Sequence, residues 1–578
     1  MPSSSRSARA FDDGPRAREL LALALFAAAL LAWWAWRGIE RHVPDPVVDR
    51  VDCVSYAPFH QPGETPFEPS NRVTRERIRA DLVRLSTITG CVRTYSIDQG
   101  LDQVPSVANE LGLQVLLGVW IGRDRERNEV ELKRALALAK SHADTIRALV
   151  VGNEVLLRGE LAESELVALA ARAKHELDVP VTYADVWEFW LRHPRLADAV
   201  DFVTVHVLPY WEDEPVAVDD AVEHVFSVYR RVQQVFPAHE ILIGETGWPR
   251  AGRQRRAAVP GRVEQARFVR GFVDAAAERG LRYNLIEAFD QPWKRRLEGA
   301  MGGYWGLFTS DGERAFPWRG PVNADPRWRE GLLGAAAGAA AFALVAGATL
   351  RRRRRRSAET GARFVLAQAL AGCAAGALLV EQWRHAVHWN QGWTHDLPAI
   401  AGALATIGYA WLATSRLSRA RGADGGHSVP GVYALACGRK AAAATRLLRA
   451  SSYRTAFALG ALRFGWLFAA AMSVVLLVFD ARYRGFPWAS FAMPLAMQAL
   501  LALRGERLPP DAREERALVV VVFVGAALAI AQETLIDAQA VVFLGGLALF
   551  ALACAGLPGS RTSTSIPSSA PKAEGANE

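Results

Sequence analysis

Two glutamates, each at the end of a short apolar run, are the residues of this sequence best suited to chemistry. Glu154 ends the string Val-Val-Gly-Asn-Glu, and Glu245 ends the string Ile-Leu-Ile-Gly-Glu. A pair of carboxylates can supply the acid, the base and the nucleophile that cleavage of a glycosidic bond requires. The two residues lie 91 positions apart, which corresponds to about three β/α units of roughly 30 residues each. We therefore expect both carboxylates on the same rim of one barrel.

Apolar runs that alternate with helical patterns predict the elements that hold these carboxylates. The runs are short and continuously apolar, which is typical of parallel strands covered on both faces. Eight such units in about 270 residues match a (β/α)₈ TIM barrel of the α/β class. The predicted strands are Val51–Ala57, Cys91–Tyr95, Leu113–Trp120, Ala148–Gly152, Val181–Val186, Phe202–Val207, Ile241–Gly244 and Tyr283–Phe289, and the predicted helices are Arg75–Thr87, Asn128–Ile146, Glu163–Leu177, Asp219–Val235 and Arg262–Glu278.

Polar and aromatic residues follow the predicted strands, at the end where TIM barrels carry their chemistry. Aromatic rings at such a rim suit sugars, whose C–H faces stack on π surfaces while their hydroxyls reach polar groups. Any one tryptophan here is also consistent with ordinary packing, and His206 fits a buried core residue as well as a sugar contact. The candidate substrate-binding residues are Asn153, Tyr56, Arg93, Tyr95, Asp98, Trp187, Tyr210, Trp211, Trp248, Glu287, Trp293 and Lys294, with Trp190 as a further aromatic candidate.

Charge is distributed unevenly along the 578 residues, of which 51% are hydrophobic. Residues 44–325 contain 35 Lys and Arg against 42 Asp and Glu, a net charge of −7, whereas the whole chain carries +8. Nucleic-acid binding requires a basic patch on a folded domain, so this distribution argues against a nucleic-acid partner. Arginine clusters beside apolar runs indicate membrane topology instead.

Apolar segments long enough to cross a bilayer flank the predicted barrel. The first, Leu20–Trp36, ends in tryptophans without a small-residue cleavage site, which favours an uncleaved anchor over a cleaved signal peptide. We therefore expect one N-terminal and about seven C-terminal transmembrane α-helices around the barrel. The C-terminal candidates are Gly331–Leu350, Phe364–Val380, Leu397–Thr414, Thr455–Phe479, Phe486–Leu503, Ala517–Ala531 and Ala538–Leu557.

Arginine-rich loops predict the orientation of these segments. The run Arg351–Arg356, the loop 415–454 and the stretch 504–516 are basic, whereas the alternate loops hold few arginines. The positive-inside rule then leaves both termini in the cytoplasm and the barrel on the periplasmic side of a bacterial inner membrane. The arginine run is better explained as a stop-transfer flank than as an anionic-lipid site. Arg463 marks either a span boundary or an inward-facing charge.

The predicted domains follow from this topology, and membrane lipid is an expected partner. They are a cytoplasmic N-terminus at 1–19, a transmembrane anchor at 20–37, a catalytic barrel at 45–325, a multi-pass helical domain at 330–557 and a disordered cytoplasmic tail at 558–578.

Cysteine spacing predicts neither a metal site nor a cofactor. No Cys-x-x-Cys pair occurs among the five cysteines, so the usual thiolate zinc patterns are missing. Cys53 and Cys91 fall in successive predicted strands and could pair in the periplasm. Disulfide geometry is demanding, however, so the sequence favours two buried free thiols.

Four motifs resemble those of glycoside hydrolase family 17, the β-1,3-glucanase family. They are Gly152-Asn153-Glu154, the string Gly-Glu-Thr-Gly-Trp-Pro at 244–249, Arg93-x-Tyr95-x-x-Asp98 and the string Gly-Tyr-Trp-Gly-Leu-Phe at 303–308. The similarity covers residues 50–318 and is strongest to bacterial membrane-bound members, which include β-1,3-glucanosyltransferases. The last strand, which reads Ile-Glu-Ala-Phe-Asp-Gln-Pro-Trp-Lys, departs from the plant members, so their substrate subsites are not carried over.

The resemblance implies a (β/α)₈ barrel and a retaining mechanism on β-glucan. Glu245 would be the nucleophile and Glu154 the acid/base, with carboxyl groups about 5 Å apart. Asn153 would bind the sugar 2-hydroxyl and Tyr210 would orient the nucleophile. A partly desolvated site beside a second carboxylate should raise the pKa of Glu154.

Three functions are compatible with these residues. The first is transglycosylation of β-1,3-glucan, the second is strict hydrolysis of the same polymer, and the third is a sugar-binding or scaffold subunit of a glucan synthase. Intact glutamates argue against the third, although a glucan synthase remains a candidate partner. The linkage formed, β-1,3 or β-1,6, the role of the C-terminal helices and the oligomeric state are left open.

Overall fold

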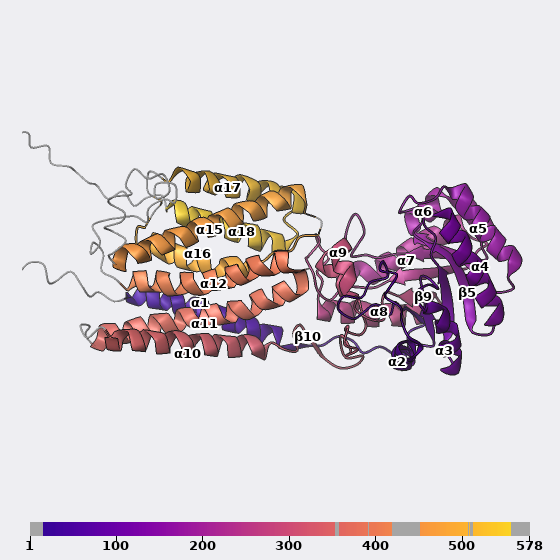
Figure 1. Cartoon of the computed structure of the whole chain (residues 1–578), viewed down its shortest axis with the longest axis horizontal. Coiled ribbons are helices and arrows are strands. Elements are labelled where there is room, and N and C mark those ends of the chain that lie inside the picture. The colour runs from indigo at the N-terminus through magenta and orange to yellow at the C-terminus, as the bar shows by residue number, and fades with distance from the viewer. Residues whose placement is uncertain are drawn as a thin grey trace, which may run out of the picture.

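The computed structural model describes residues 15–352, 358–390, 392–418, 451–481, 483–506, 508 and 512–556. The molecule is elongated, with a barrel at one end and a bundle of long helices at the other (Figure 1). The predicted tail and most of the predicted loop 415–454 lie outside the described residues.

Eight parallel strands close into a barrel, which confirms the predicted fold class. Helices cover the barrel from outside, and the short helices α3 (Val104–Glu110), α6 (Trp187–Arg192) and α9 (Arg295–Glu298) were not predicted from the sequence. The strands are β2 (Cys53–Ser55), β3 (Cys91–Arg93), β4 (Gln114–Val119), β5 (Ile146–Asn153), β6 (Val181–Val186), β7 (Val203–His206), β8 (Ile241–Thr246) and β9 (Arg282–Leu285). The longer covering helices are α2 (Arg75–Leu85), α4 (Arg125–Ser141), α5 (Glu163–Glu176), α7 (Val218–Val235) and α8 (Arg262–Glu278).

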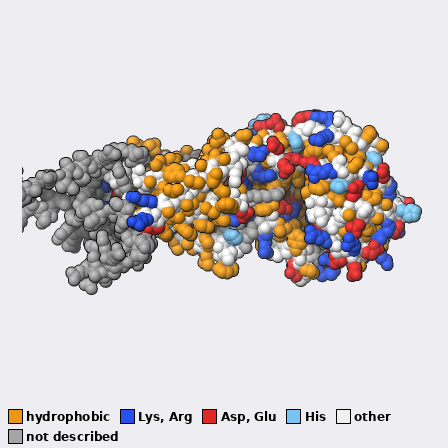
Figure 2. Space-filling view, turned by 90° about the horizontal axis from the view of Figure 1, so that it is seen from above, with side chains coloured by type: hydrophobic (Ala, Val, Ile, Leu, Met, Phe, Trp, Pro, Cys, Tyr) orange, Lys and Arg blue, Asp and Glu red, His pale blue; other side chains and the backbone are white. Residues whose placement is uncertain are grey.

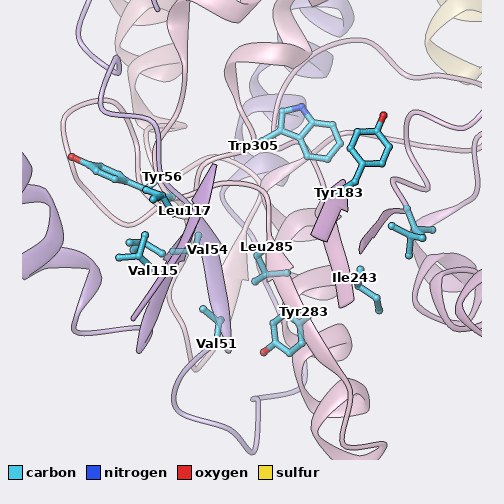
Figure 3. Packing of buried hydrophobic residues seen from close by; sticks show 14 of the residues in the cluster. Val51, Val54, Tyr56, Val115, Leu117, Tyr183, Ile243, Tyr283, Leu285 and Trp305 are labelled. Carbon is cyan, nitrogen blue, oxygen red and sulfur yellow. The ribbon is translucent and has the colours of Figure 1, made fainter. Parts of the chain in front are cut away.

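Successive side chains along each strand point alternately outward and inward, which separates the apolar side chains into two clusters. One cluster, which includes Val54, Val115 and Leu117, lies between the sheet and the helices (Figure 3). The other includes Leu116, Val150 and Leu242 and fills the lower part of the barrel. Successive strand residues point to opposite faces of a sheet, so the two sets cannot mix. The inward-facing positions that follow the second cluster along the strands are polar, and they begin the site described below.

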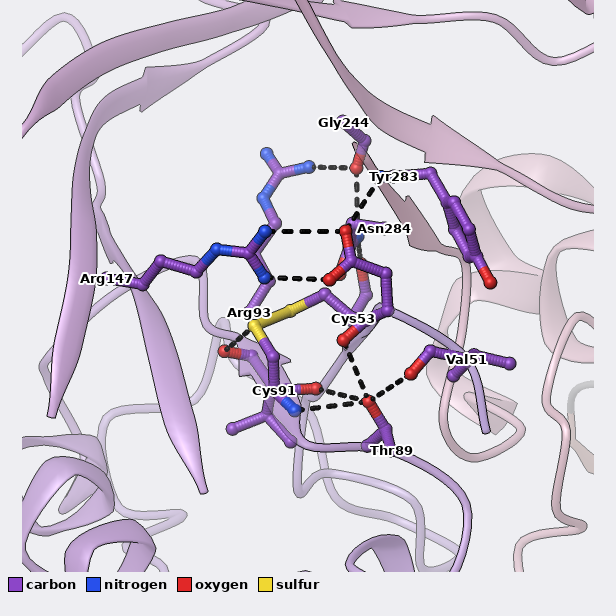
Figure 4. Close-up of a disulfide and its surroundings, with 12 residues drawn as sticks. Val51, Cys53, Thr89, Cys91, Arg93, Arg147, Gly244, Tyr283 and Asn284 are labelled. Atoms are coloured by element: carbon purple, nitrogen blue, oxygen red, sulfur yellow. Dashed lines mark hydrogen bonds and ion pairs between the residues drawn. A yellow bond between two sulfur atoms is a disulfide. The ribbon is translucent and has the colours of Figure 1, made fainter. Parts of the chain in front are cut away.

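A disulfide joins Cys53 of β2 to Cys91 of β3 (Figure 4). The prediction of two free thiols was therefore wrong. Val54 pairs with Val92 in the sheet, so the two cysteines face each other across neighbouring strands with their Cα atoms 4.5 Å apart. This separation lies within the range that a disulfide can bridge. Strand register, which the sequence does not reveal, decides the pairing.

Within the described residues, six helices are long and apolar enough to cross a membrane, which indicates a membrane protein. Figure 2 shows apolar side chains covering much of the bundle and charged ones gathered on the barrel. Two of the eight predicted spans fall short of this criterion: α16 is apolar but shorter, and α17 begins with charged residues. The bundle contains α1 (Ala17–Arg37), α10 (Arg329–Arg352), α11 (Ala358–Trp389), α12 (Trp393–Leu417), α15 (Ser451–Phe479), α16 (Trp488–Leu503), α17 (Arg513–Glu533) and α18 (Ala538–Ala555).

Two glycine pairs let α10 and α11 pack at backbone contact. A Cβ atom on Gly338 would lie 2.1 Å from the carbonyl oxygen of Gly372, and one on Gly376 would lie 2.0 Å from that of Gly334. Small residues at four-residue spacing permit this close approach between membrane helices. The sequence Gly-x-x-x-Gly occurs on both helices, so the contact surface is built into each of them.

A buried ion pair within the bundle answers the question left open for Arg463. Its guanidinium lies 2.9 Å from a carboxylate oxygen of Glu515 on α17, and both side chains are buried. Arg463 is therefore an inward-facing charge.

A second ion-pair network joins the barrel to the bundle where the chain enters and leaves the barrel. The two-stranded sheet of β1 (Glu40–Arg41) and β10 (Val322–Asn323) stands at this junction. Arg37 at the end of α1 lies 3.3 Å from Asp325 and 3.1 Å from Glu381 of α11. The connection is thus held by charges as well as by the covalent chain.

Candidate active site

Polar side chains replace apolar ones at the upper inward-facing positions of the barrel. Ser55, Arg93, His206 and Asn284 are all buried there, on four different strands. Asn284 donates to the Ser55 hydroxyl at 2.7 Å. It also donates to the Gly244 carbonyl at 2.8 Å (Figure 4). These bonds tie the ends of β2, β8 and β9 together beneath the mouth of the barrel.

The barrel brings the two predicted glutamates to this mouth. Glu245 lies within β8, and Glu154 directly follows β5. One oxygen of each carboxylate and a ring nitrogen of His206 all lie within 4.8 Å of one another. Carboxyl separations near 5 Å are typical of retaining glycosidases, whereas inverting enzymes need a gap wide enough for water. The Glu154 side chain is 23% exposed and that of Glu245 only 6%, so Glu154 is the more accessible of the two.

Backbone geometry at Glu154 is unusual for a residue with a side chain. Its φ angle is 54°, in the left-handed region, and Gly152 two residues earlier has a φ of 89°. The Glu154 amide donates to the Ala184 carbonyl of β6 at 2.8 Å. Left-handed conformations at non-glycine residues cost energy and occur often at functional sites. The turn directs the carboxylate toward the barrel axis rather than along the strand.

Tyr95 and Arg93 hold the carboxylate of Glu245. The Tyr95 hydroxyl donates to Glu245 Oε1 at 2.7 Å, and Arg93 Nη1 donates to the same oxygen at 3.3 Å. Burial, with the nearby charge of Glu245, raises the pKa of Tyr95 well above its ordinary value, so the phenol stays a donor. A buried carboxylate with a cation and a hydroxyl donor is stabilised in its ionised form.

Tyr210, which we expected to orient the nucleophile, does not contact it. Its hydroxyl donates to the Arg253 carbonyl at 2.6 Å, and its ring packs edge-on against Trp248 and Trp305. The prediction was wrong because Tyr210 lies four residues beyond β7, where the turn carries the ring into the apolar cluster. Tyr95, two residues beyond the end of β3, contacts Glu245 instead.

His206 connects the two glutamates through Arg93. Its Nδ1 lies 2.8 Å from Glu154 Oε1, and its Nε2 lies 3.3 Å from Arg93 Nη1. A guanidinium can only donate, so Nε2 accepts and Nδ1 carries the hydrogen that is donated to Glu154. His206 is thus buried, and it also contacts both carboxylates.

The pKa of Glu154 is lowered below its ordinary value, against our expectation of a raised pKa. Burial pushes this pKa upward, but the hydrogen bond from His206 and the charges of Arg158 and Arg93 together outweigh burial. The expectation considered only desolvation and the second carboxylate, and it omitted the cations that the fold brings close.

Arg93 also holds the side chain of Asn153. Its side-chain oxygen accepts from Arg93 Nη2 at 2.6 Å. With the oxygen engaged, the amide nitrogen is the group that remains to donate to a ligand. Arg93 therefore orients Asn153 and Glu245 and also fixes the tautomer of His206.

A second charged cluster lies on the segment that follows β9. Lys294 Nζ lies 2.8 Å from Glu287. Burial raises the pKa of Glu287 to about 7, although Lys294 opposes this shift. Burial also raises the pKa of Glu298 to about 7, again against Lys294, and repulsion from Glu154 and Glu245 adds to it. Glu298 lies on the short helix α9 and was missed from the sequence because four residues carry no helical pattern.

Other predicted rim residues separate into two groups. Trp187, Trp211 and Trp293 are half-buried; Trp187 donates to Glu212 at 3.3 Å, and Trp293 to Gln291 at 2.7 Å. Trp190 and Trp248 are fully buried and donate their indole N–H to backbone carbonyls. Both are core residues, so the prediction of sugar contacts by Trp190 and Trp248 was wrong.

Tyr56 and Asp98 also lie away from the two glutamates. The Tyr56 hydroxyl is buried and donates to Asp81 of α2 at 3.0 Å. Asp98 lies 2.6 Å from Arg134 of α4. Their strands end at the correct rim, but the turns that follow direct the side chains toward the covering helices.

The donor atoms of Glu154, His206 and Glu245 would suit a divalent cation by type. Arg93 opposes this use, because its Nη1 lies 3.3 Å from both His206 Nε2 and Glu245 Oε1. A fixed guanidinium there would repel a metal ion. The site is arranged for acid–base and nucleophilic chemistry rather than for a metal.

Residues 53–306 match the family model described as the BtgE/BtgC glycoside hydrolase domain. The sequence is 28% identical over 227 residues to a probable beta-glucosidase btgE of Aspergillus fumigatus, covering 38% of this chain and 39% of the relative. It is 28% identical over 258 residues to a putative glucan endo-1,3-beta-glucosidase btgC of Aspergillus niger, covering 39% and 36%. The chain thus spans less than half the length of these curated relatives.

Two further relatives are a curated protein and a solved structure. A glucan 1,3-beta-glucosidase of Arthroderma benhamiae is 27% identical over 248 residues, which cover 39% of this chain and 78% of the relative. The crystal structure of a glycoside hydrolase family 17 beta-1,3-glucanosyltransferase from Rhizomucor miehei is 22% identical, with a TM-score of 0.41, and covers 46% of this chain and 95% of that one.

Proposed function

We propose, from the premise that residues 53–306 form a glycoside hydrolase domain of the BtgE/BtgC type, that this protein remodels β-1,3-glucan by a retaining mechanism. Glu245 is the nucleophile and Glu154 the acid/base. The observation that carries the proposal is the short separation of these carboxylates, within 4.8 Å, in environments that differ in exposure and in hydrogen-bond partners.

In the first step, Glu245 attacks the anomeric carbon and the glycosidic C–O bond breaks. Arg93 and Tyr95 support an ionised and oriented Glu245. Glu154 gives its proton to the departing oxygen, and a covalent glycosyl-enzyme forms. Asn153, oriented by Arg93, donates to the sugar 2-hydroxyl, a contact that strengthens in the transition state.

In the second step, Glu154 removes a proton from an incoming hydroxyl, which attacks the anomeric carbon and releases Glu245. A glucan acceptor gives transglycosylation, and water gives hydrolysis. Trp187, Trp211 and Trp293 offer half-buried aromatic surfaces for further sugars. We favour transfer, because a membrane-anchored enzyme stays close to polymer that a glucan synthase would supply.

We also propose that the barrel stands on the periplasmic side of a bacterial inner membrane, with both termini in the cytoplasm and the domain bounds given above. The buried disulfide supports an oxidising compartment. Trp36, Trp383 and Trp393 are exposed at the barrel end of the bundle, where an interfacial aromatic belt in contact with lipid headgroups would lie.

The test is incubation of the full-length protein, in detergent or nanodiscs, with laminari-oligosaccharides, followed by product sizing. Products longer than the substrate indicate transfer, and only shorter products indicate hydrolysis. Glu245→Ala should abolish both while the protein stays folded. If the protein binds the oligosaccharides but forms no product, the proposed enzymatic activity is refuted and a sugar-binding subunit is favoured.

The roles of the two glutamates can be distinguished with an activated aryl β-laminarioside, because its leaving group departs without being protonated. Glu154→Gln should retain the first step on this substrate and lose activity on glucan. Glu245→Ala should lose both. Equal losses in both variants on both substrates would contradict the assigned roles.

A further inference from the structure

Two loops of the active-site rim lie directly on the outer ends of the membrane helices. We call them the docking loops: residues 250–256, between β8 and α8, and residues 291–304, which include α9. Figure 1 shows α9 between the barrel and the bundle. Arg250 joins the two loops, because its amide donates to the Tyr304 carbonyl at 2.9 Å and its guanidinium pairs with Asp290.

Arg253 anchors the first docking loop in the bundle. Its side chain is 4% exposed and pairs with Glu533 at the end of α17. It also donates to the Ala481 carbonyl at 2.6 Å, and its guanidinium lies 4.9 Å from the centre of the Phe486 ring. Burying a guanidinium is costly unless its partners are in place, so these contacts favour a single docked arrangement.

The backbone of Arg253 holds the segment that follows β7. The Arg253 carbonyl accepts from the Tyr210 hydroxyl at 2.6 Å. Arg255, two residues on, donates to the Tyr210 carbonyl at 2.6 Å, and its guanidinium lies 5.0 Å from the centre of the Trp211 ring. One loop thus connects α17 to a half-buried tryptophan at the rim.

The second docking loop repeats this arrangement. Arg295 donates to the Val387 carbonyl of α11 at 2.7 Å, and the Tyr304 ring packs against His388 at 4.7 Å. Lys294 directly precedes Arg295 and pairs with Glu287 at 2.8 Å, and Glu298 lies between the two anchors along the chain. Burial and the charges of Glu154 and Glu245 raise the pKa of Glu298. Both loops therefore meet the bundle on one side and the site on the other.

We propose that the membrane bundle is a structural part of the glucan-binding cleft and that Arg253 is its principal positioning residue. Docking of Arg253 fixes Tyr210 and Trp211, and thereby fixes a sugar subsite at some distance from the reacting bond. This inference depends on the proposed glucan-active function. Long glucans should need the docked loop, whereas the shortest substrates should not.

The experiment measures binding without turnover, in full-length protein carrying Glu245→Gln. Calorimetry measures the affinity of this protein for two probes, laminarihexaose and laminaribiose. Adding Arg253→Gln should weaken hexaose binding about tenfold, the equivalent of one aromatic contact, and leave biose binding within about twofold. Arg253→Lys, which keeps the charge, should restore hexaose binding to within about threefold of the original.

The matched control is Arg230→Gln, which removes an arginine whose pairing with Glu223 lies on the exposed face of α7. It should change neither affinity. In catalytically intact protein, Arg253→Gln should raise KM for the hexaose with little change in kcat.

Several outcomes would overturn the proposal. One is that Arg253→Gln weakens the binding of both probes equally. Another is that it weakens the binding of neither. A third is failure of Arg253→Gln, Arg253→Lys and Glu533→Gln to fold while the control folds, because Arg253 would then be purely structural. Absence of products from the unsubstituted chain, with the expected binding pattern intact, would instead refute the proposed reaction alone.

Discussion

Tyr95 donates its hydroxyl hydrogen to Glu245 at 2.7 Å across the mouth of the barrel. Tyr95 follows β3 by two residues and Glu245 lies near the end of β8, and Arg93, the last residue of β3, reinforces the contact. This relationship gives the nucleophile a fixed direction and a stabilised negative charge.

Tyr95→Phe should lower kcat about 10- to 100-fold, because hydrogen bonds to charged groups contribute roughly 1.5–3 kcal/mol. KM should change little. Steady-state kinetics on laminari-oligosaccharides would measure both. Tyr56→Phe is the control, since its hydroxyl bonds to Asp81 away from the site; it should reduce stability without changing kcat. An unchanged kcat in Tyr95→Phe would show that the Tyr95 hydroxyl does not support Glu245 in the reaction.

His206→Asn should shift the pH dependence of kcat/KM. His206 lowers the pKa of Glu154 by its hydrogen bond, against the opposing effect of burial. Without the imidazole the pKa of Glu154 should rise, so its acid form should persist to higher pH. The basic limb of the profile should therefore move upward, by up to about one pH unit. A downward shift, or none, would show that His206 does not control this proton.

Removing the disulfide should destabilise the barrel without altering its chemistry. The bridge closes a loop of sequence separation 38, and disulfides of this kind contribute about 2–4 kcal/mol. Cys53→Ala with Cys91→Ala should lower the thermal midpoint of the barrel, as followed by near-ultraviolet circular dichroism. Cys373→Ala, at a cysteine that is not paired, is the comparison. Alkylation of Cys53 in unreduced, denatured protein would contradict the bridge.

Alanine at Gly338 should loosen the contact between α10 and α11. The added Cβ would lie 2.1 Å from the Gly372 carbonyl, whereas one at Gly347 on the same helix would meet nothing within 4 Å. Gly347→Ala should be neutral or stabilising by up to about 1 kcal/mol, since alanine favours helix. Thermal stability in detergent should therefore fall only for Gly338→Ala. Equal behaviour of both variants would exclude the close packing.

Sequence patterns predicted the parts of this protein that depend on local chemistry. Apolar runs ending at glycine located the strands that carry Glu154 and Glu245, and the barrel brings both to one rim. The long apolar segments indicated a membrane protein, and six helices in the described part of the chain meet the length and composition required. Hydrophobic burial is read from residue type alone, so these features can be predicted without coordinates.

Tertiary structure decided which side chains meet. Tyr95 rather than Tyr210 reaches Glu245, Cys53 pairs with Cys91, and Trp248 is a core residue. The pKa of Glu154 is lowered by His206 and Arg93, which come from distant parts of the chain, as well as by the nearby Arg158. Contacts of this kind depend on strand register, on turn direction and on the docking of the barrel against the helices. Those are properties of the closed and packed chain, and no short segment of sequence contains them.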